Sequence, residues 1–122
     1  MSIVVENSTV LSALTEKFAE VFGDTKKVEY FFSPGRINLI GEHTDYNGGY
    51  VFPASITIGT TGLARLREDN KVKLYSENFP KLGVIEFDLD DVENKDGELW
   101  SNYVKGMIVM LKGAGYEIDK GF

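Results

Sequence analysis

The sequence predicts an α+β fold with a mainly antiparallel or mixed sheet and two or more helices. One apolar segment with helical spacing lies near each end of the chain, and the segments between them are rich in β-branched and aromatic residues. Strands and helices do not alternate in the way that a parallel βαβ sheet requires. The expected order is therefore helix, strand, loop, three strands, helix.

Composition narrows the class of protein. The 122 residues include 13 basic and 19 acidic side chains and carry a formal net charge of −6, which argues against nucleic acid or a membrane surface as a partner. No apolar run approaches the length of about 18 residues that a membrane-spanning helix needs. The absence of cysteine excludes disulfides and thiolate metal sites and is typical of a reducing cytosol. We expect one domain, residues 1–122, located in the cytoplasm.

The first helix is predicted to end at residue 22. Asn7 or Ser8 can cap its first turn, and Gly23 can end it. Its apolar face consists of residues that recur at helical spacing, namely Val10, Leu11, Leu14, Phe18, Val21 and Phe22.

Four segments between the helices are predicted as strands. Residues 28–32 are aromatic and β-branched and lead into a loop. Residues 56–67 and 71–76 are predicted to form a hairpin that turns at residues 68–70, because apolar residues and lysines alternate in its second half. Residues 84–89 form the last predicted strand.

The second helix is predicted from Leu99 to Leu111, after an acidic connection over residues 88–98, and it ends near Gly113. Its spacing predicts one broad apolar face made of Leu99, Trp100, Tyr103, Val104, Met107, Ile108 and Leu111.

The segment from Pro34 to Pro53 combines an arginine, two carboxylates, four glycines and His43, the one histidine of the chain. Glycine and asparagine permit positive φ angles, so we expect a tightly folded loop. A fixed loop with converging charges is a common form of binding site. The residues expected to pin this loop onto a core are Ile37, Leu39, Ile40, Tyr46, Val51 and Phe52.

The polar side chains of this loop suit a sugar or a phosphate. Arg36 is a permanent planar cation that binds phosphate or carboxylate oxygens. Glu42 and Asp45 can each accept hydrogen bonds from adjacent sugar hydroxyls. His43 can donate or accept a hydrogen bond near neutral pH. Asn47 is expected to bond to the backbone of the loop itself.

Other interpretations of these residues stay open. The arginine and the two acids could form an internal ion-pair network that holds the loop in shape. A metal site of Glu42, His43 and Asp45 is disfavoured, because adjacent residues seldom face one ion and the chain has no second histidine. For Trp100 and Tyr103 a place in the helix core is the default, and a stacking surface for a flat ligand is the alternative.

The run Gly35–Gly49, GRINLIGEHTDYNGG, resembles the N-terminal sugar-recognition motif of galactokinases, which belong to the GHMP small-molecule kinases. The segment Trp100–Gly106, WSNYVKG, resembles a helix of the same family, and the lead-in Phe32–Gly35 agrees as well. The resemblance spans essentially the whole chain. It implies the N-terminal part of a GHMP-kinase-type domain.

The reaction implied by this resemblance is the ATP-dependent phosphorylation of the anomeric hydroxyl of galactose, with Mg²⁺ on the nucleotide. Arg36 would stabilise charge on the transferred phosphoryl group in the transition state. The residues implied to bind galactose are Arg36, Glu42, His43, Thr44 and Asp45, and those implied to lie against the adenine are Trp100 and Tyr103.

The family's Ser-rich phosphate-binding loop and its catalytic aspartate are missing from the 122 residues. Because phosphoryl transfer depends on positioning and charge neutralisation, the resemblance predicts a truncated sugar-binding domain that is inactive alone. An unpaired strand edge in such a domain predicts self-association. Three other functions stay open: a non-catalytic galactose sensor of the same family, a kinase for N-acetylgalactosamine or arabinose, and an interaction module without a ligand.

Overall fold

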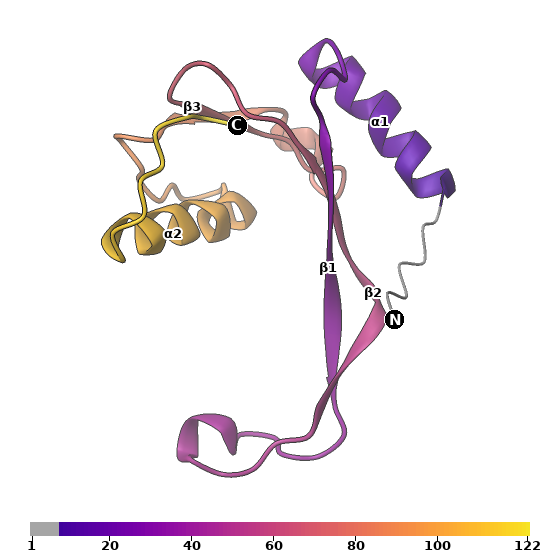
Figure 1. The fold of residues 1–122 in the computed structure, drawn as a ribbon, viewed down its shortest axis with the longest axis vertical. Coiled ribbons are helices and arrows are strands. Elements are labelled where there is room, and N and C mark those ends of the chain that lie inside the picture. The colour runs from indigo at the N-terminus through magenta and orange to yellow at the C-terminus, as the bar shows by residue number, and fades with distance from the viewer. Residues whose placement is uncertain (1–7) are drawn as a thin grey trace.

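The computed structural model describes residues 8–122 and has the predicted α+β class (Figure 1). Both predicted helices are confirmed, and the candidate cap Asn7 lies outside the described residues. The elements in chain order are α1 (Ser8–Phe22), β1 (Glu29–Asn38), the short 3-10 helix η1 (Asp45–Asn47), β2 (Pro53–Ala64), β3 (Lys71–Leu74), the 3-10 helix η2 (Pro80–Leu82), β4 (Ile85–Asp88) and α2 (Leu99–Gly113).

The strands form two separate antiparallel pairs, β1 with β2 and β3 with β4. In the first pair Glu29 lies opposite Ala64, and in the second Lys71 lies opposite Asp88. The predicted hairpin between residues 56–67 and 71–76 is therefore wrong. The Arg65 guanidinium bonds to the carbonyl oxygens of Phe22 at 3.0 Å and Asp24 at 3.1 Å, which ties the end of β2 to the end of α1.

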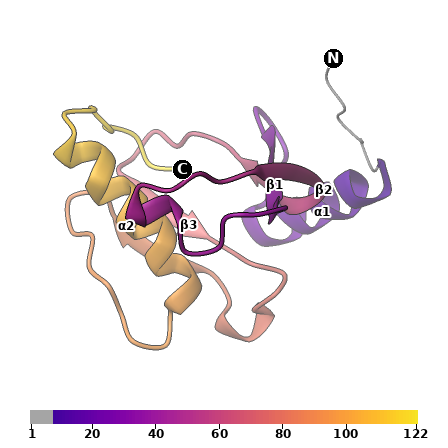
Figure 2. The ribbon, with the colours of Figure 1, turned by 90° about the horizontal axis from the view of Figure 1, so that it is seen from below.

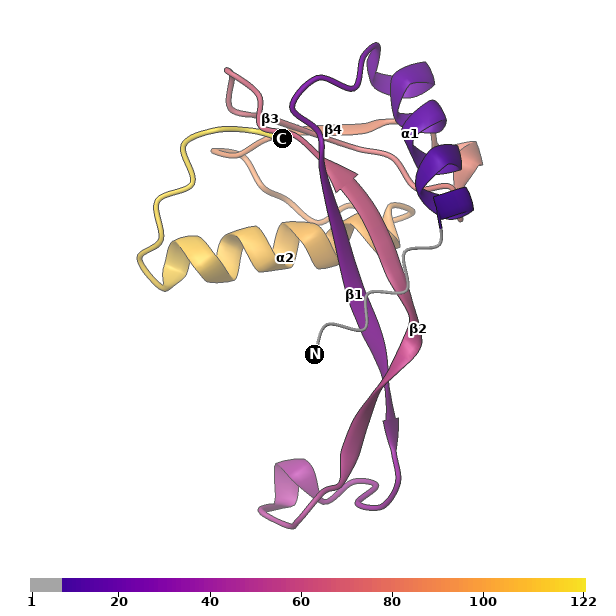
Figure 3. The same cartoon turned by 45° about the vertical axis from the view of Figure 1, so that its right-hand side comes forward.

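The first pair is a long hairpin that extends away from the rest of the molecule (Figures 1 and 3). β1 continues six residues beyond the predicted strand end, because the pair accommodates Pro34 and Gly35 in a register shift between Pro34 and Arg36. A Cβ on Gly35 would lie 2.8 Å from the Ile58 carbonyl oxygen, so the backbone approach here requires glycine.

The loop at the far end of this hairpin is not pinned onto a core, which corrects the sequence prediction. A two-stranded ribbon has two open faces, and in the described part of the chain the loop extends beyond the packed elements (Figures 1 and 3). The six apolar side chains predicted to anchor it are between 40% and 72% exposed, namely Ile37, Leu39, Ile40, Tyr46, Val51 and Phe52.

The core lies between the second strand pair and α2. Its buried apolar residues are Val72, Ile85, Phe87, Leu89 and Ile108. The apolar face of α2 is narrower than predicted, since the two short strands cover only part of the helix. Tyr103, Met107 and Leu111 are exposed, whereas the polar residues Ser101 and Lys105 are buried.

The last two residues lie along β3. Gly121 N donates to the Asp69 carbonyl at 2.7 Å, and Lys73 N donates to the Phe122 carbonyl at 2.9 Å. A Cβ on Gly121 would lie 2.0 Å from the Lys71 carbonyl oxygen, so this approach also requires glycine. Figures 1 and 2 place α1 and α2 on opposite sides of the β1–β2 hairpin. Neither helix among residues 8–122 has the length and apolarity to cross a membrane.

Candidate functional site

The loop between β1 and β2 is shaped by its own backbone. Leu39 N donates to the Phe52 carbonyl at 3.0 Å, and Phe52 N donates to the Ile40 carbonyl at 2.9 Å, which closes the base of the loop. Beyond this base η1 forms, and Gly48 ends it at a φ of 73°, a left-handed conformation that glycine adopts without strain. The prediction of a tightly folded loop is confirmed for residues 39–52, whereas residues 34–38 belong to β1 and Pro53 begins β2.

Thr44 braces this loop from within. Its hydroxyl lies 2.7 Å from the Gly41 carbonyl oxygen and 3.0 Å from the Tyr50 carbonyl oxygen, so its one hydrogen is directed at the loop backbone. Its own carbonyl accepts from Gly49 N at 2.8 Å and from Asn47 N at 3.1 Å. Thr44 therefore joins the two sides of the loop.

His43 is held at both its backbone and its ring. Asn47 Nδ2 donates to the His43 carbonyl at 2.7 Å, as the sequence predicted for an asparagine in this loop. The Nδ1 atom of His43 forms a hydrogen bond with the Tyr46 hydroxyl, and the two rings meet edge to face with their centroids 5.9 Å apart. The contact between Tyr46 and His43 was not predicted from the sequence. The only sequence signal for it is the short separation of three positions between the two residues.

The three charged residues of the candidate site carry no partner of the described part of the chain. Arg36 lies on β1, and Glu42 and Asp45 lie on the loop, and none of the three is buried. None of the ion pairs or hydrogen bonds among residues 8–122 includes their side chains, so the alternative of an internal ion-pair brace is wrong for these residues. Their charges are available to a ligand.

Trp100 and Tyr103 lie on α2, apart from this loop. Trp100 lines a cavity of about 500 Å³ together with Phe18, Phe22 and Phe122, and its Nε1 is buried without a hydrogen-bond partner in the described chain. Tyr103 is 82% exposed and does not line this cavity. Figures 1 and 3 show the loop at the end of the hairpin that lies away from α2. Four of the five predicted sugar-binding residues thus lie on the loop and Arg36 lies on β1, whereas the two predicted adenine contacts lie apart on α2.

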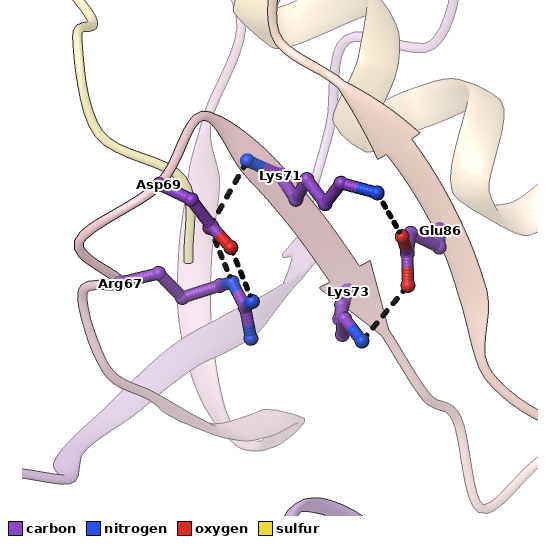
Figure 4. Close-up of polar contacts among 5 residues, drawn as sticks. All are labelled: Arg67, Asp69, Lys71, Lys73 and Glu86. Atoms are coloured by element: carbon purple, nitrogen blue, oxygen red, sulfur yellow. Dashed lines mark hydrogen bonds and ion pairs between the residues drawn. The ribbon is translucent and has the colours of Figure 1, made fainter.

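The cavity is lined by charged residues that include Arg67, Lys73 and Glu86, and the ion pairs of these three were not predicted from the sequence. Glu86 lies 2.8 Å from both the Lys71 and the Lys73 ammonium groups, which hold the pKa of its carboxyl at about 2 (Figure 4). Arg67 donates to both oxygens of Asp69, at 2.7 and 2.6 Å, and lowers the pKa of that carboxyl to about 2. The alternating lysines of β3 indicated a charged strand face, but Glu86 is identified as their partner only by the pairing of β3 with β4.

The sequence matches a family description over the first hairpin. Residues 16–66 match the galactokinase galactose-binding signature, a range that includes β1, the loop and β2. A galactokinase from Lactococcus lactis subsp. lactis strain IL1403 is 97% identical over all 122 residues, which cover 31% of that protein. A galactokinase from Ligilactobacillus salivarius is 57% identical over 108 residues, which cover 88% of this chain and 28% of that protein.

A solved structure agrees with these relatives. The crystal structure of Lactococcus lactis galactokinase complexed with galactose superposes with a TM-score of 0.88 at 96% identity, over 92% of this chain and 29% of that chain. This chain spans about 30% of the length of the curated relatives it matches. The signature, the sequence identity and the fold therefore agree in showing that this chain is similar to one part of a galactokinase.

Proposed function

We propose that this chain, as a single domain over residues 1–122, is the galactose-binding part of a kinase that transfers phosphate from ATP to the anomeric hydroxyl of galactose. The observation that carries the proposal is the state of the loop within the matched signature. Glu42 and Asp45 on the loop and Arg36 on the adjoining β1 are accessible and unpaired in the described chain, and the loop backbone is held in shape by its own hydrogen bonds. Charges that no internal partner satisfies are suited to a polar ligand.

Four loop residues provide complementary hydrogen-bonding groups for a hexose. Glu42 and Asp45, when ionised, accept hydrogens from sugar hydroxyls and can each take two at once. His43 adds a ring nitrogen, and Thr44 can accept one bond at its oxygen while its hydrogen stays with the loop. Two acceptors close together on a fixed backbone favour a sugar with adjacent hydroxyls in the matching orientation.

Arg36 is proposed to act on the phosphoryl group. Its guanidinium is a planar cation that offers a set of donors to phosphate oxygens. Because it lies on β1, a fixed strand, it can stabilise charge that develops during transfer with little rearrangement. This role makes Arg36 the one proposed catalytic residue of the chain.

Trp100 and Tyr103 are proposed to contact the adenine of ATP. They are three positions apart on α2 and are thus neighbours on the helix surface. The buried Trp100 Nε1 lacks a partner among the described residues, and the exposed Tyr103 ring is free to stack. Residues 8–122 provide no cluster of histidine, aspartate or glutamate that could hold a metal ion. The described residues therefore do not fit a Mg²⁺ site made of protein side chains.

A chimera gives the direct test of this function. This chain replaces the matching 31% of the Lactococcus lactis galactokinase, and sugar-dependent ADP release is measured with galactose and with glucose. We expect the chimera to release ADP with galactose and not with glucose. Arg36→Lys should lower kcat by about 100-fold or more, since one lost transition-state donor costs that much in other enzymes. An inactive chimera, or one that Arg36→Lys leaves unchanged, would refute the assignment.

The chain by itself should bind sugar weakly and turn over no ATP, because the sequence provides no phosphate-binding loop. Titration of the ¹⁵N-labelled chain with galactose should shift amide signals of residues 36–46, and Glu42→Gln or Asp45→Asn should weaken this response about tenfold. Glu93→Gln, an exposed carboxylate on the connection before α2, is the control and should have no effect. Sugar-dependent ADP release by the pure chain would contradict the proposal.

Self-association is the expected state of the isolated chain. The β1–β2 hairpin pairs with no further strand among residues 8–122, and its exposed apolar side chains include Phe31, Phe32, Ile37 and Ile58. Open strand edges next to apolar surface promote pairing between copies. Light scattering at increasing concentration should show a rising mass, and a constant monomer mass would contradict this expectation.

A further inference from the structure

His43 adopts a backbone conformation that is unusual for a residue with a side chain. Its φ is 61°, in the left-handed region, where residues other than glycine are uncommon and cost free energy. Such a conformation persists when the surrounding contacts enforce it. Asn47 supplies the backbone contact, with Nδ2 at 2.7 Å from the His43 carbonyl oxygen. The position of His43 is therefore specified by its neighbours.

Tyr46 supplies the contact to the ring. Its hydroxyl bonds to His43 Nδ1, and the rings pack with an interplanar angle of 72°. Nδ1 accepts in one neutral tautomer and donates in the other, and its partner selects between them. The unprotonated ring nitrogen is a stronger acceptor than a phenol oxygen, so Tyr46 acts as the donor. The hydrogen of the neutral ring is then carried by Nε2.

This tautomer complements the two carboxylates of the loop. Each sugar hydroxyl has one hydrogen, and when it donates that hydrogen to Glu42 or Asp45 its oxygen still accepts a bond. An Nε2–H group provides the donor that the carboxylates lack. In the other tautomer Nε2 would be an acceptor and would compete with the carboxylates for the same hydroxyl hydrogens.

We propose that Tyr46 is a positioning residue, which fixes the tautomer and orientation of His43 so that Nε2–H donates to a sugar hydroxyl oxygen. The sugar contact rests on the proposed function, whereas the fixed tautomer does not. Tyr46 acts through His43 and needs no contact with the sugar itself.

The tautomer is measured first. His43 is the one histidine of the chain, so long-range ¹H–¹⁵N correlation spectra report a single imidazole. We expect the Nε2–H form in the parent chain and a mixture of tautomers in Tyr46→Phe, which keeps the ring and removes the hydroxyl. Tyr50→Phe is the matched control, because Tyr50 lies on the same loop and is 99% exposed. A parent chain in the Nδ1–H form, or a Tyr46→Phe variant with an unchanged tautomer, would overturn the proposal.

Galactose titration of the same three proteins then tests the sugar contact. Tyr46→Phe should weaken binding about three- to tenfold, which corresponds to one hydrogen bond, and Tyr50→Phe should change it less than about twofold. Unchanged signals from Val72 and Ile85 confirm that the distant core stays folded. Equal galactose affinity in parent and Tyr46→Phe would overturn the sugar contact. A parent chain with the expected tautomer and no galactose response would refute the contact together with the proposed function, while the role of Tyr46 in fixing the ring would stand.

Discussion

The Nζ atom of Lys105 lies 3.0 Å from Glu98 Oε2 and stacks over the Phe87 ring, with its charge buried beneath α2. Glu98 sits at the N-terminus of this helix and keeps part of its side chain in solvent. The pair is the one strongly buried ion pair of the described chain. An unpaired charge on Lys105 would be buried, whereas an unpaired charge on Glu98 would still reach solvent.

Removing the acid of this pair should cost more than removing the base. Glu98→Ala leaves the buried Lys105 charge unpaired and should destabilise the chain by about 2 kcal/mol, less than a fully buried pair because water reaches Glu98. Lys105→Met keeps an apolar contact with Phe87 and leaves Glu98 at a helix N-terminus, where negative charge is favourable, so its cost should be below about 1 kcal/mol. Urea unfolding followed by circular dichroism measures both. If both variants lose the same free energy of unfolding, the burial of the Lys105 charge does not determine the cost of breaking this pair.

Acid should destabilise the second strand pair. The ordinary pKa of a glutamate is 4.5, and the Lys71 and Lys73 ammonium groups lower the pKa of Glu86 to about 2 in the folded chain. The folded form thus binds fewer protons, so this stabilisation is full above pH 4.5 and is lost as pH falls toward 2. Glu86→Gln should flatten the fall of the urea midpoint between about pH 5 and about pH 2.5, whereas Glu93→Gln should leave its slope unchanged. If the urea midpoint falls with pH at the same slope in Glu86→Gln and in the parent, Glu86 is not the cause of the acid destabilisation.

The same substitution at two glycines should have opposite effects. Gly121→Ala places a methyl group 2.0 Å from the Lys71 carbonyl oxygen, and the required backbone shift should cost about 1–3 kcal/mol. Gly106 lies inside α2, and a methyl group added there would meet no atom beyond the helix's own backbone within 4 Å. Gly106→Ala should therefore stabilise by about 0.5–1 kcal/mol through helix propensity. Thermal unfolding of both variants checks the signs. A neutral Gly121→Ala would mean that the last residues do not hold to β3 in solution.

Thr44 should act on the loop through its hydroxyl. Thr44→Val keeps the shape and removes the bonds to the Gly41 and Tyr50 carbonyls, so amide exchange at Gly49 should become faster by about tenfold. Thr44→Ser keeps the hydroxyl and should exchange as the parent does. The exchange at Gly49 should be slower in the parent than in Thr44→Val even without galactose, because the Thr44 hydrogen bonds are present in the free chain. Unchanged exchange in Thr44→Val would exclude the brace.

Local chemistry made several features predictable. Apolar spacing located both helices, and the glycine and asparagine content of residues 34–53 predicted a loop with positive φ angles at its turns. The run from Gly35 to Gly49 was enough to suggest the family, because backbone turns and ligand charges lie within one short segment there. Asn47 bonds to the backbone as its type and position indicated.

Strand partners and burial were decided only by the tertiary structure. Both β2 and β3 have strand-like sequences, but pairing depends on long-range register, so the chain paired β2 with β1 and β3 with β4. The apolar loop residues stay exposed because no described layer covers the hairpin, and Lys105 is buried because Glu98 and Phe87 compensate its charge. The contact of Tyr46 with His43 joins residues three positions apart, but it was missed because the sequence pattern does not predict the positive φ of His43. Local sequence patterns thus determine where helices and turns form. Strand pairing and side-chain burial depend on the energy of contacts between distant residues.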